Sequence, residues 1–123
     1  MENQNLKFDF VFLGQSVLKY QVPLDIFSTI NQIYEQNFNN LAPANGQLVG
    51  KIENEHSLFY HGEDQTKMKN HNMLPTNVTD YLMTVFKHYL SFNKIKEYKT
   101  HLNSIWVNEM KQHEYNPAHI HRG

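Results

Sequence analysis

The sequence contains no cysteine and a single tryptophan, and no apolar run in it approaches the roughly 20 residues that a membrane-spanning helix needs. Without cysteine, neither a disulfide framework nor a thiolate zinc site can form. The 11 basic and 12 acidic side chains leave a net charge of −1, which gives no electrostatic basis for binding nucleic acid or an anionic membrane. No basic start followed by an apolar stretch marks a secretory signal. We therefore expect a cytoplasmic protein with no nucleic-acid or membrane partner.

The 123 residues are enough for one domain with a buried core, and we expect residues 1–123 to form a single domain. Apolar and polar residues alternate in several segments, a period typical of strands. Strands are predicted at residues 8–12, 17–22, 48–60 and 100–110, and from residue 115 onward. Recurrence at three and four residues predicts helices over 24–38 and 78–90, and polar segments predict loops at 41–46 and 61–74. This order indicates an α+β fold in which two helices pack on one face of a sheet.

Both predicted helices carry start signals. Pro23 has the backbone angle of a first helical turn, and Asp25 beside it complements the positive end of the helix dipole. Thr76 or Asn77 is the predicted N-cap of the second helix, with Asp80 in its first turn.

The C-terminal residues carry the clearest chemical motif, because His119 and His121 lie two residues apart after a predicted strand. Side chains at i and i+2 point to the same face of a strand, so the two imidazoles would converge on one metal ion if the strand continued through them. Asn116 and Pro117 favour an extended approach to this motif. Two imidazoles bind a metal weakly, so a third ligand from a distant segment is required.

Segment 105–110, which reads Ile-Trp-Val-Asn-Glu-Met, and segment 114–121, which reads Glu-Tyr-Asn-Pro-Ala-His-Ile-His, resemble the 2-oxoglutarate/Fe(II)-dependent oxygenases. More narrowly, they are similar to a prolyl-hydroxylase-like group common in marine phages and bacteria. Residues 12–23, and 48–52 with the following Glu55, also look like the N-terminal half of this group. The resemblance implies the N-terminal part of a double-stranded β-helix, or jelly roll, that is incomplete in this chain.

The chemistry that this resemblance implies couples decarboxylation of 2-oxoglutarate at Fe(II) to hydroxylation of a protein side chain or a small metabolite. His119 matches the first iron ligand, whereas His121 stands where most of the superfamily has a carboxylate. Tyr115 and Asn116 would lie beside the small-molecule cosubstrate, 2-oxoglutarate. The distal histidine and the arginine that binds 2-oxoglutarate would come from later strands that this sequence does not contain.

Two other functions remain open from the sequence. The chain can be a non-enzymatic viral structural or binding module, or a zinc-binding protein in which His113 joins His119 and His121. A half-exposed strand explains the polar residues Glu53, Glu55 and His56, and packing in a sheet explains Trp106. Because a partial jelly roll leaves strands unpaired, we also expect the chain to form homo-oligomers through its sheet edges.

Overall fold

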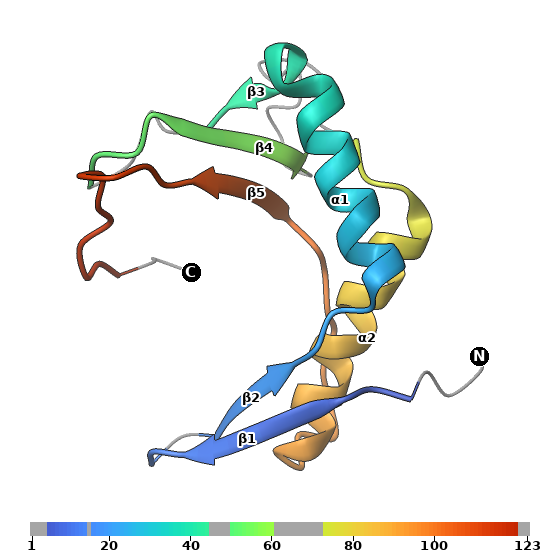
Figure 1. Ribbon diagram of the computed structural model, residues 1–123. Helices are drawn as coiled ribbons and strands as arrows, with labels where there is room; N and C mark the ends of the chain where they lie inside the picture. The colour runs from blue at the N-terminus through green and yellow to red at the C-terminus, as the bar shows by residue number, and fades with distance from the viewer. Residues whose placement is uncertain (1–4, 15, 45–49, 61–72, 121–123) are drawn as a thin grey trace. The chain divides into compact units, whose positions relative to one another are not determined.

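The computed structural model describes residues 5–14, 16–44, 50–60 and 73–120 (Figure 1). Its elements, in chain order, are β1 (Phe8–Phe12), β2 (Ser16–Tyr20), α1 (Leu24–Asn37), a 3-10 helix (Phe38–Asn40), β3 (Ala42–Pro43), β4 (Asn54–Tyr60), α2 (Thr76–Phe92) and β5 (Ser104–Glu109). The fold is mixed α+β, as predicted. Contacts divide the chain into two compact units. Unit 1 comprises Met1–Asn31 and Pro75–Leu102, and unit 2 comprises Gln32–Leu74 and Asn103–Gly123.

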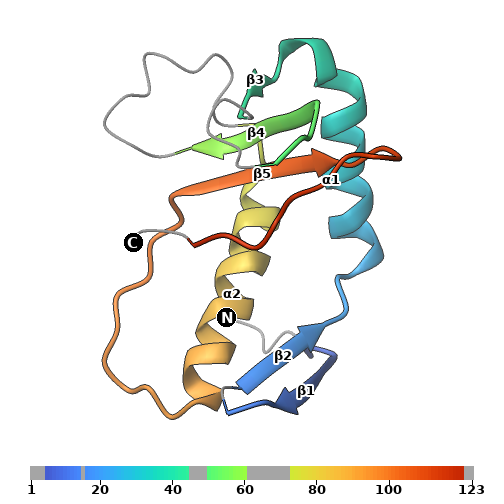
Figure 2. The same cartoon turned by 90° about the vertical axis from the view of Figure 1, so that its left-hand side faces the viewer.

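The strands form two small antiparallel sheets instead of the single expected sheet. β1 pairs with β2, and the second sheet has the order β3-β4-β5. The physical reason is that β1 and β2 are consecutive and joined by a tight turn, in which Gly14 takes a φ of 83°, so their pairing is satisfied locally. β4 has a neighbour on both edges (Figure 2). In the described residues these strands do not close into a barrel.

Unit 1 is a β-hairpin packed on α2. The rings of Phe8 and Phe10 lie 6.2 and 5.4 Å from the ring of Phe92, and the Tyr20 hydroxyl is hydrogen-bonded to Nδ1 of His88 at 2.6 Å. The apolar stripe of α2 explains this contact, because residues three and four apart lie on one helix face. Three apolar side chains form the buried centre of the unit: Ile26, Val78 and Tyr81.

Unit 2 is centred on β4. Leu58 is fully buried there, and the C-terminal part of α1 lies against the same strand. The ring of Phe38 is 4.6 Å from that of His56, and the ring of Tyr34 is 6.1 Å from it. Each sheet therefore has its own helical neighbour within its unit, whereas we expected both helices on one face of one sheet. Four further apolar residues are buried in unit 2: Leu41, Ala42, Ile52 and Leu74.

The start of α2 differs from the prediction. The helix begins at Thr76 with Pro75 at the N-cap, no side chain donates or accepts a capping bond, and the first turn holds no acidic residue. Thr76 and Asn77 are thus inside the helix and Asp80 lies beyond its first turn. Pro75 has the extended backbone of an N-cap residue, and its carbonyl accepts hydrogen bonds from the amides of Val78 and Thr79 at 3.1 and 3.3 Å.

Three predicted extended segments are shorter in the structure. β4 begins at Asn54 and β5 at Ser104, inside the predicted ranges 48–60 and 100–110, of which residues 48 and 49 lie outside the described residues. Of the strand predicted from Tyr115 onward, residues 115–120 form one bridge, between Tyr115 and Lys51, and residues 121–123 lie outside the described residues. The short β3 lies in a segment predicted as a loop. Residues 61–72 of the other predicted loop lie outside the described residues. No helix in the described ranges has the length and apolar character to cross a membrane.

Candidate functional site

The segment that leads to the predicted ligand His119 is held by backbone contacts in unit 2. The amide of Lys51 donates to the carbonyl of Tyr115 at 2.8 Å, and the amide of Tyr115 donates back at 3.0 Å. Gly50 lies against the same segment: a Cβ at Gly50 would overlap the Tyr115 carbonyl and come within 2.9 Å of Pro117 Cδ. The path of the chain from Tyr115 to Pro117 is therefore fixed by a position that accepts only glycine.

The turn before this segment is organised by Glu114. Its carboxylate accepts hydrogen bonds from the amide of Lys111 at 2.7 Å and the amide of Glu53 at 2.9 Å. These two bonds hold the pKa of Glu114 below its usual value, because a carboxylate that accepts backbone N–H groups is favoured in its charged form. Lys111 also pairs with Glu53 at 3.2 Å, and this contact raises the lysine pKa. Residues 111–115 thus form a bonded turn joined to residues 51–53.

His119 is exposed, and its Nδ1 lies 2.8 Å from the carbonyl oxygen of Pro117. A carbonyl oxygen only accepts, so Nδ1 carries the proton and donates it. The neutral imidazole then presents the lone pair of Nε2, which is the form that coordinates metal ions. The chain bends at Ala118 and forms no strand at His119, so the strand that would align His119 with His121 is absent up to residue 120.

The other predicted site residues are not gathered around His119. Tyr115 is 57% exposed, and Asn116 is exposed as well. His121 lies outside the described residues. His113 has a φ of 70°, a turn conformation that places it in the bonded turn. Over the described ranges, no three His, Asp or Glu side chains are grouped to hold a metal ion.

A polar network links α1 to the β4–β5 sheet. The hydroxyl of Tyr34 donates to Glu109 Oε2 at 2.8 Å, and Asn54 Nδ2 donates to the same oxygen at 3.2 Å. Burial and the bond to Glu109 raise the pKa of Tyr34 to about 12. The two donors lower the pKa of Glu109. Both groups therefore keep one charge state near neutral pH, and the network is structural.

Glu55 corrects the prediction that residues 53–56 are a half-exposed stretch. Its side chain is 6% exposed, and its Oε2 has no hydrogen-bond partner in the described structure. Burial raises the pKa of this carboxyl, because desolvation disfavours the charged form. β4 is the central strand of its sheet, so its side chains are covered more than an edge-strand pattern suggests.

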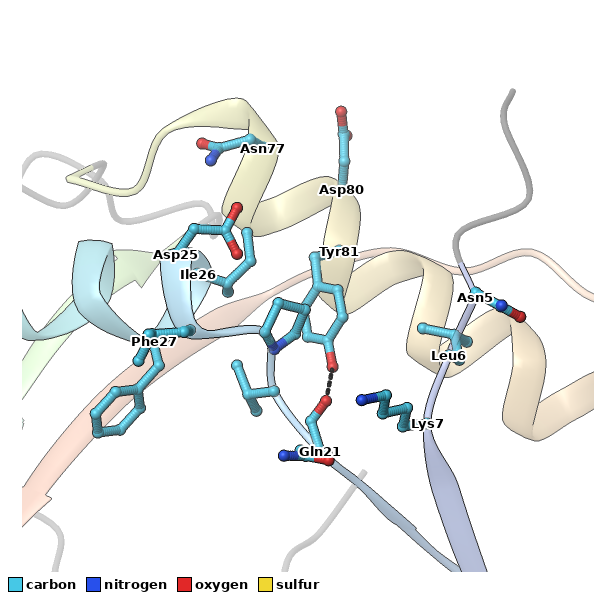
Figure 3. A pocket seen from close by; sticks show the side chains of 13 residues that line it. Asn5, Leu6, Lys7, Gln21, Asp25, Ile26, Phe27, Asn77, Asp80 and Tyr81 are labelled. Atoms are coloured by element: carbon cyan, nitrogen blue, oxygen red, sulfur yellow. Dashed lines mark hydrogen bonds between the residues drawn. The ribbon is translucent and has the colours of Figure 1, made fainter.

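Unit 1 contains an open pocket of about 960 Å³ at the start of α1 (Figure 3). Lys7, Asp25 and Asp80 bring charges of both signs to its rim, and Ile26 contributes apolar floor. The hydroxyl of buried Tyr81 donates to the carbonyl of Gln21 at 3.4 Å, which ties α2 to the end of β2. Such a lining suits binding of a small polar molecule. Sequence reasoning missed it, since Lys7 and Tyr81 meet only through tertiary packing.

Gly50 is the other residue that sequence reasoning missed. Its signal was present, because an isolated glycine in an extended segment often marks the close approach of another backbone. The partner segment, residues 115–117, cannot be read from the same signal.

Comparison of this chain with models of protein families, with curated protein sequences and with solved structures finds no match. The likeness to the oxygenases therefore depends on the residues of the motif alone.

Proposed function

We propose that this chain carries the metal-ligating segment of a 2-oxoglutarate/Fe(II)-dependent hydroxylase and is the N-terminal part of an incomplete jelly-roll domain. The hydrogen bond from His119 Nδ1 to the Pro117 carbonyl carries the proposal. Histidines that bind metals almost always donate their second ring N–H to a carbonyl or carboxylate, which fixes the tautomer and the ring orientation. His119 has this arrangement within the motif that resembles the oxygenases.

The resemblance to the oxygenases suggests a role for each of four residues. His119 and His121 would ligate Fe(II), and Tyr115 and Asn116 would bind 2-oxoglutarate. The bridge from Tyr115 to Lys51 supports the roles of Tyr115 and Asn116, because it holds the backbone at Tyr115. When bound, Fe(II) and 2-oxoglutarate would supply the oxidative chemistry that hydroxylates a protein side chain or small metabolite, while the protein supplies position.

A complete metal site requires ligands in addition to His119. Iron of this class is held by three protein ligands, and the described residues provide one of them, His119. The proposal therefore requires His121 and a third ligand from residues outside the described ranges.

Anaerobic calorimetric titration with Mn(II), a redox-silent substitute for Fe(II), tests the proposal with and without 2-oxoglutarate. Because the third ligand and the arginine that binds 2-oxoglutarate are expected on later strands outside this sequence, we expect Mn(II) to bind weakly to His119 and His121, and 2-oxoglutarate to leave that binding unchanged. His119→Ala and His121→Ala should each abolish Mn(II) binding. His113→Ala is the matched control, since it removes an imidazole of the same segment, and it should leave the titration unchanged.

The alternatives have distinct outcomes in this titration. Zinc could instead bind stoichiometrically, require His113 and be unaffected by 2-oxoglutarate. That result would support a zinc-binding protein and contradict the hydroxylase. If neither Mn(II) nor zinc binds, the result would support the non-enzymatic module.

The non-enzymatic alternative is favoured by one observation. Phe12 and Leu13 at the end of the hairpin are 72% and 77% exposed. Apolar side chains that are exposed side by side suit contact with another macromolecule.

A further inference from the structure

The outer edge of β1 presents unpaired backbone groups. The amide of Gln21 donates to the carbonyl of Lys7 at 3.0 Å, so Lys7 and Gln21 form a hydrogen-bonded pair of the antiparallel ladder. Because such pairs alternate with non-bonded pairs, Asp9 and Val11 also direct their backbone groups toward β2. The N–H and C=O groups of Phe8, Phe10 and Phe12 therefore point away from β2, along an edge where no described strand lies.

The two edges of the hairpin differ. On β2, the outward carbonyl of Ser16 accepts a hydrogen bond from the Tyr89 hydroxyl at 3.2 Å, so α2 occupies part of that edge. All five residues of β1 are exposed, with Phe10 at 58%. β1 also lacks the proline, bulge or lysine within the strand that commonly protects an edge from pairing. The edge of β1 is thus the open one.

The charges along β1 are self-complementary. Lys7 precedes Asp9 by two residues on the same face of the strand. If two copies of β1 pair in antiparallel fashion about Phe8, Lys7 of each copy faces Asp9 of the other in a non-hydrogen-bonded pair, where side chains lie closest. Pairing about Asp9 would place two carboxylates opposite each other and is disfavoured.

We propose that the outer edge of β1 binds a second copy of this chain, forming a two-fold dimer in which β1 strands pair about Phe8. Each copy uses its open edge once, so the assembly closes at two chains. The resulting four-stranded sheet satisfies the outward groups of Phe8 and Phe10 and removes apolar surface around them from water. The proposed dimer does not depend on the proposed metal site.

Analytical ultracentrifugation of the whole chain over a range of concentrations tests the dimer. Lys7→Asp and Asp9→Lys each place like charges across the interface, and we expect each to weaken dimerisation about tenfold. The double variant Lys7→Asp/Asp9→Lys restores opposite charges across the two-fold axis and should recover the wild-type association. A purely structural role for either residue would not predict this recovery.

A backbone variant provides the second measurement. Phe10→Pro removes an outward N–H that β2 does not use, so it should abolish the dimer while the hairpin remains. Phe10→Ala is the matched control, because it removes the same ring but keeps the N–H, and it should retain more association than the proline variant. If circular dichroism shows that Phe10→Pro does not fold, the charge variants alone test the dimer. A monomeric wild-type chain, or a dimer that the charge variants leave unchanged, would overturn the proposal.

Discussion

At the scale of single residues, the buried carboxyl of Glu55 gives unit 2 a pH dependence. Burial raises its pKa, so the folded chain binds this proton more tightly than the unfolded chain does. The contribution of Glu55 to stability is therefore most favourable below the ordinary carboxyl pKa and declines as the pH rises above it. Glu55→Gln removes the charge and should raise the free energy of unfolding at pH 7 by about 1 kcal/mol.

Urea unfolding followed by the fluorescence of Trp106, the one tryptophan and a residue of unit 2, measures this change at pH 4.5 and pH 7. The gain from Glu55→Gln should be larger at pH 7 than at pH 4.5. Glu35→Gln is the control, since Glu35 is exposed, and it should change neither value. An equal effect of Glu55→Gln at both pH values would contradict a pH-dependent contribution of this carboxyl to stability.

Gly50 makes a second prediction for a single residue. Gly50→Ala forces the Tyr115–Pro117 segment away from Lys51 and should destabilise unit 2 by about 1–3 kcal/mol. Hydrogen exchange should show faster exchange of the Lys51 and Tyr115 amides. Gly14→Ala, where the Cβ meets no atom within 4 Å and φ is 83°, adds only backbone strain and should leave both amides protected.

The environment of these two residues could be predicted only in part from the sequence. The alternation around Glu55 identifies a strand but not its place in a sheet, and a central strand buries what an edge strand exposes. The glycine at position 50 indicates a close approach without naming Tyr115. The pairing of Glu55 with Asn108 of β5 and the approach of Tyr115 to Gly50 each join segments more than 50 residues apart in the chain.

At the scale of elements, the turn at residues 111–114 depends on one carboxylate. The pKa of Glu114 is lowered by the bonds it accepts from the Lys111 and Glu53 amides, so its contribution is present above the ordinary carboxyl pKa and is lost as the pH falls through the lowered value. We expect Glu114→Gln to weaken the turn, because a neutral amide accepts weaker hydrogen bonds than a carboxylate.

Amide proton chemical shifts of Lys111 and Glu53, followed by NMR as the pH falls, report this turn. Both should move with one common midpoint in the wild-type chain and lose that transition in Glu114→Gln. Glu53→Gln breaks the ion pair with Lys111 but leaves the bonds to Glu114, so the common midpoint should persist. Independent midpoints for the two amides would contradict the shared acceptor.

Local patterns predicted β1, β2, both helices and β5 close to where they occur, because hydrophobic periodicity acts within a few positions. They failed where an element is defined by a distant partner. β3 is two residues long and exists through its pairing with β4, and within residues 115–120 the strand predicted from Tyr115 onward forms one bridge, to Lys51. The His119–His121 motif is a local pattern too, and its third ligand stays a prediction.

At the scale of the whole molecule, several large apolar side chains of the described residues are exposed, and many of them lie in unit 1. Self-association through β1 would cover some of this surface, and any partner that binds the folded state stabilises it. We therefore expect the thermal midpoint of the wild-type chain to rise with protein concentration. Differential scanning calorimetry should show no such rise for Phe10→Pro, while a concentration-independent midpoint in both chains would argue against the dimer.

The division into two units has a consequence for how this protein is made. Unit 1 consists of an N-terminal piece and residues 75–102, and unit 2 consists of the intervening piece and the C-terminal residues. The first boundary falls inside α1, between Asn31 and Gln32. During synthesis, unit 1 can therefore fold only after α2 has left the ribosome, and unit 2 can fold only after β5 has. Neither unit corresponds to a continuous stretch of the gene, so no single truncation can yield one without cutting the other.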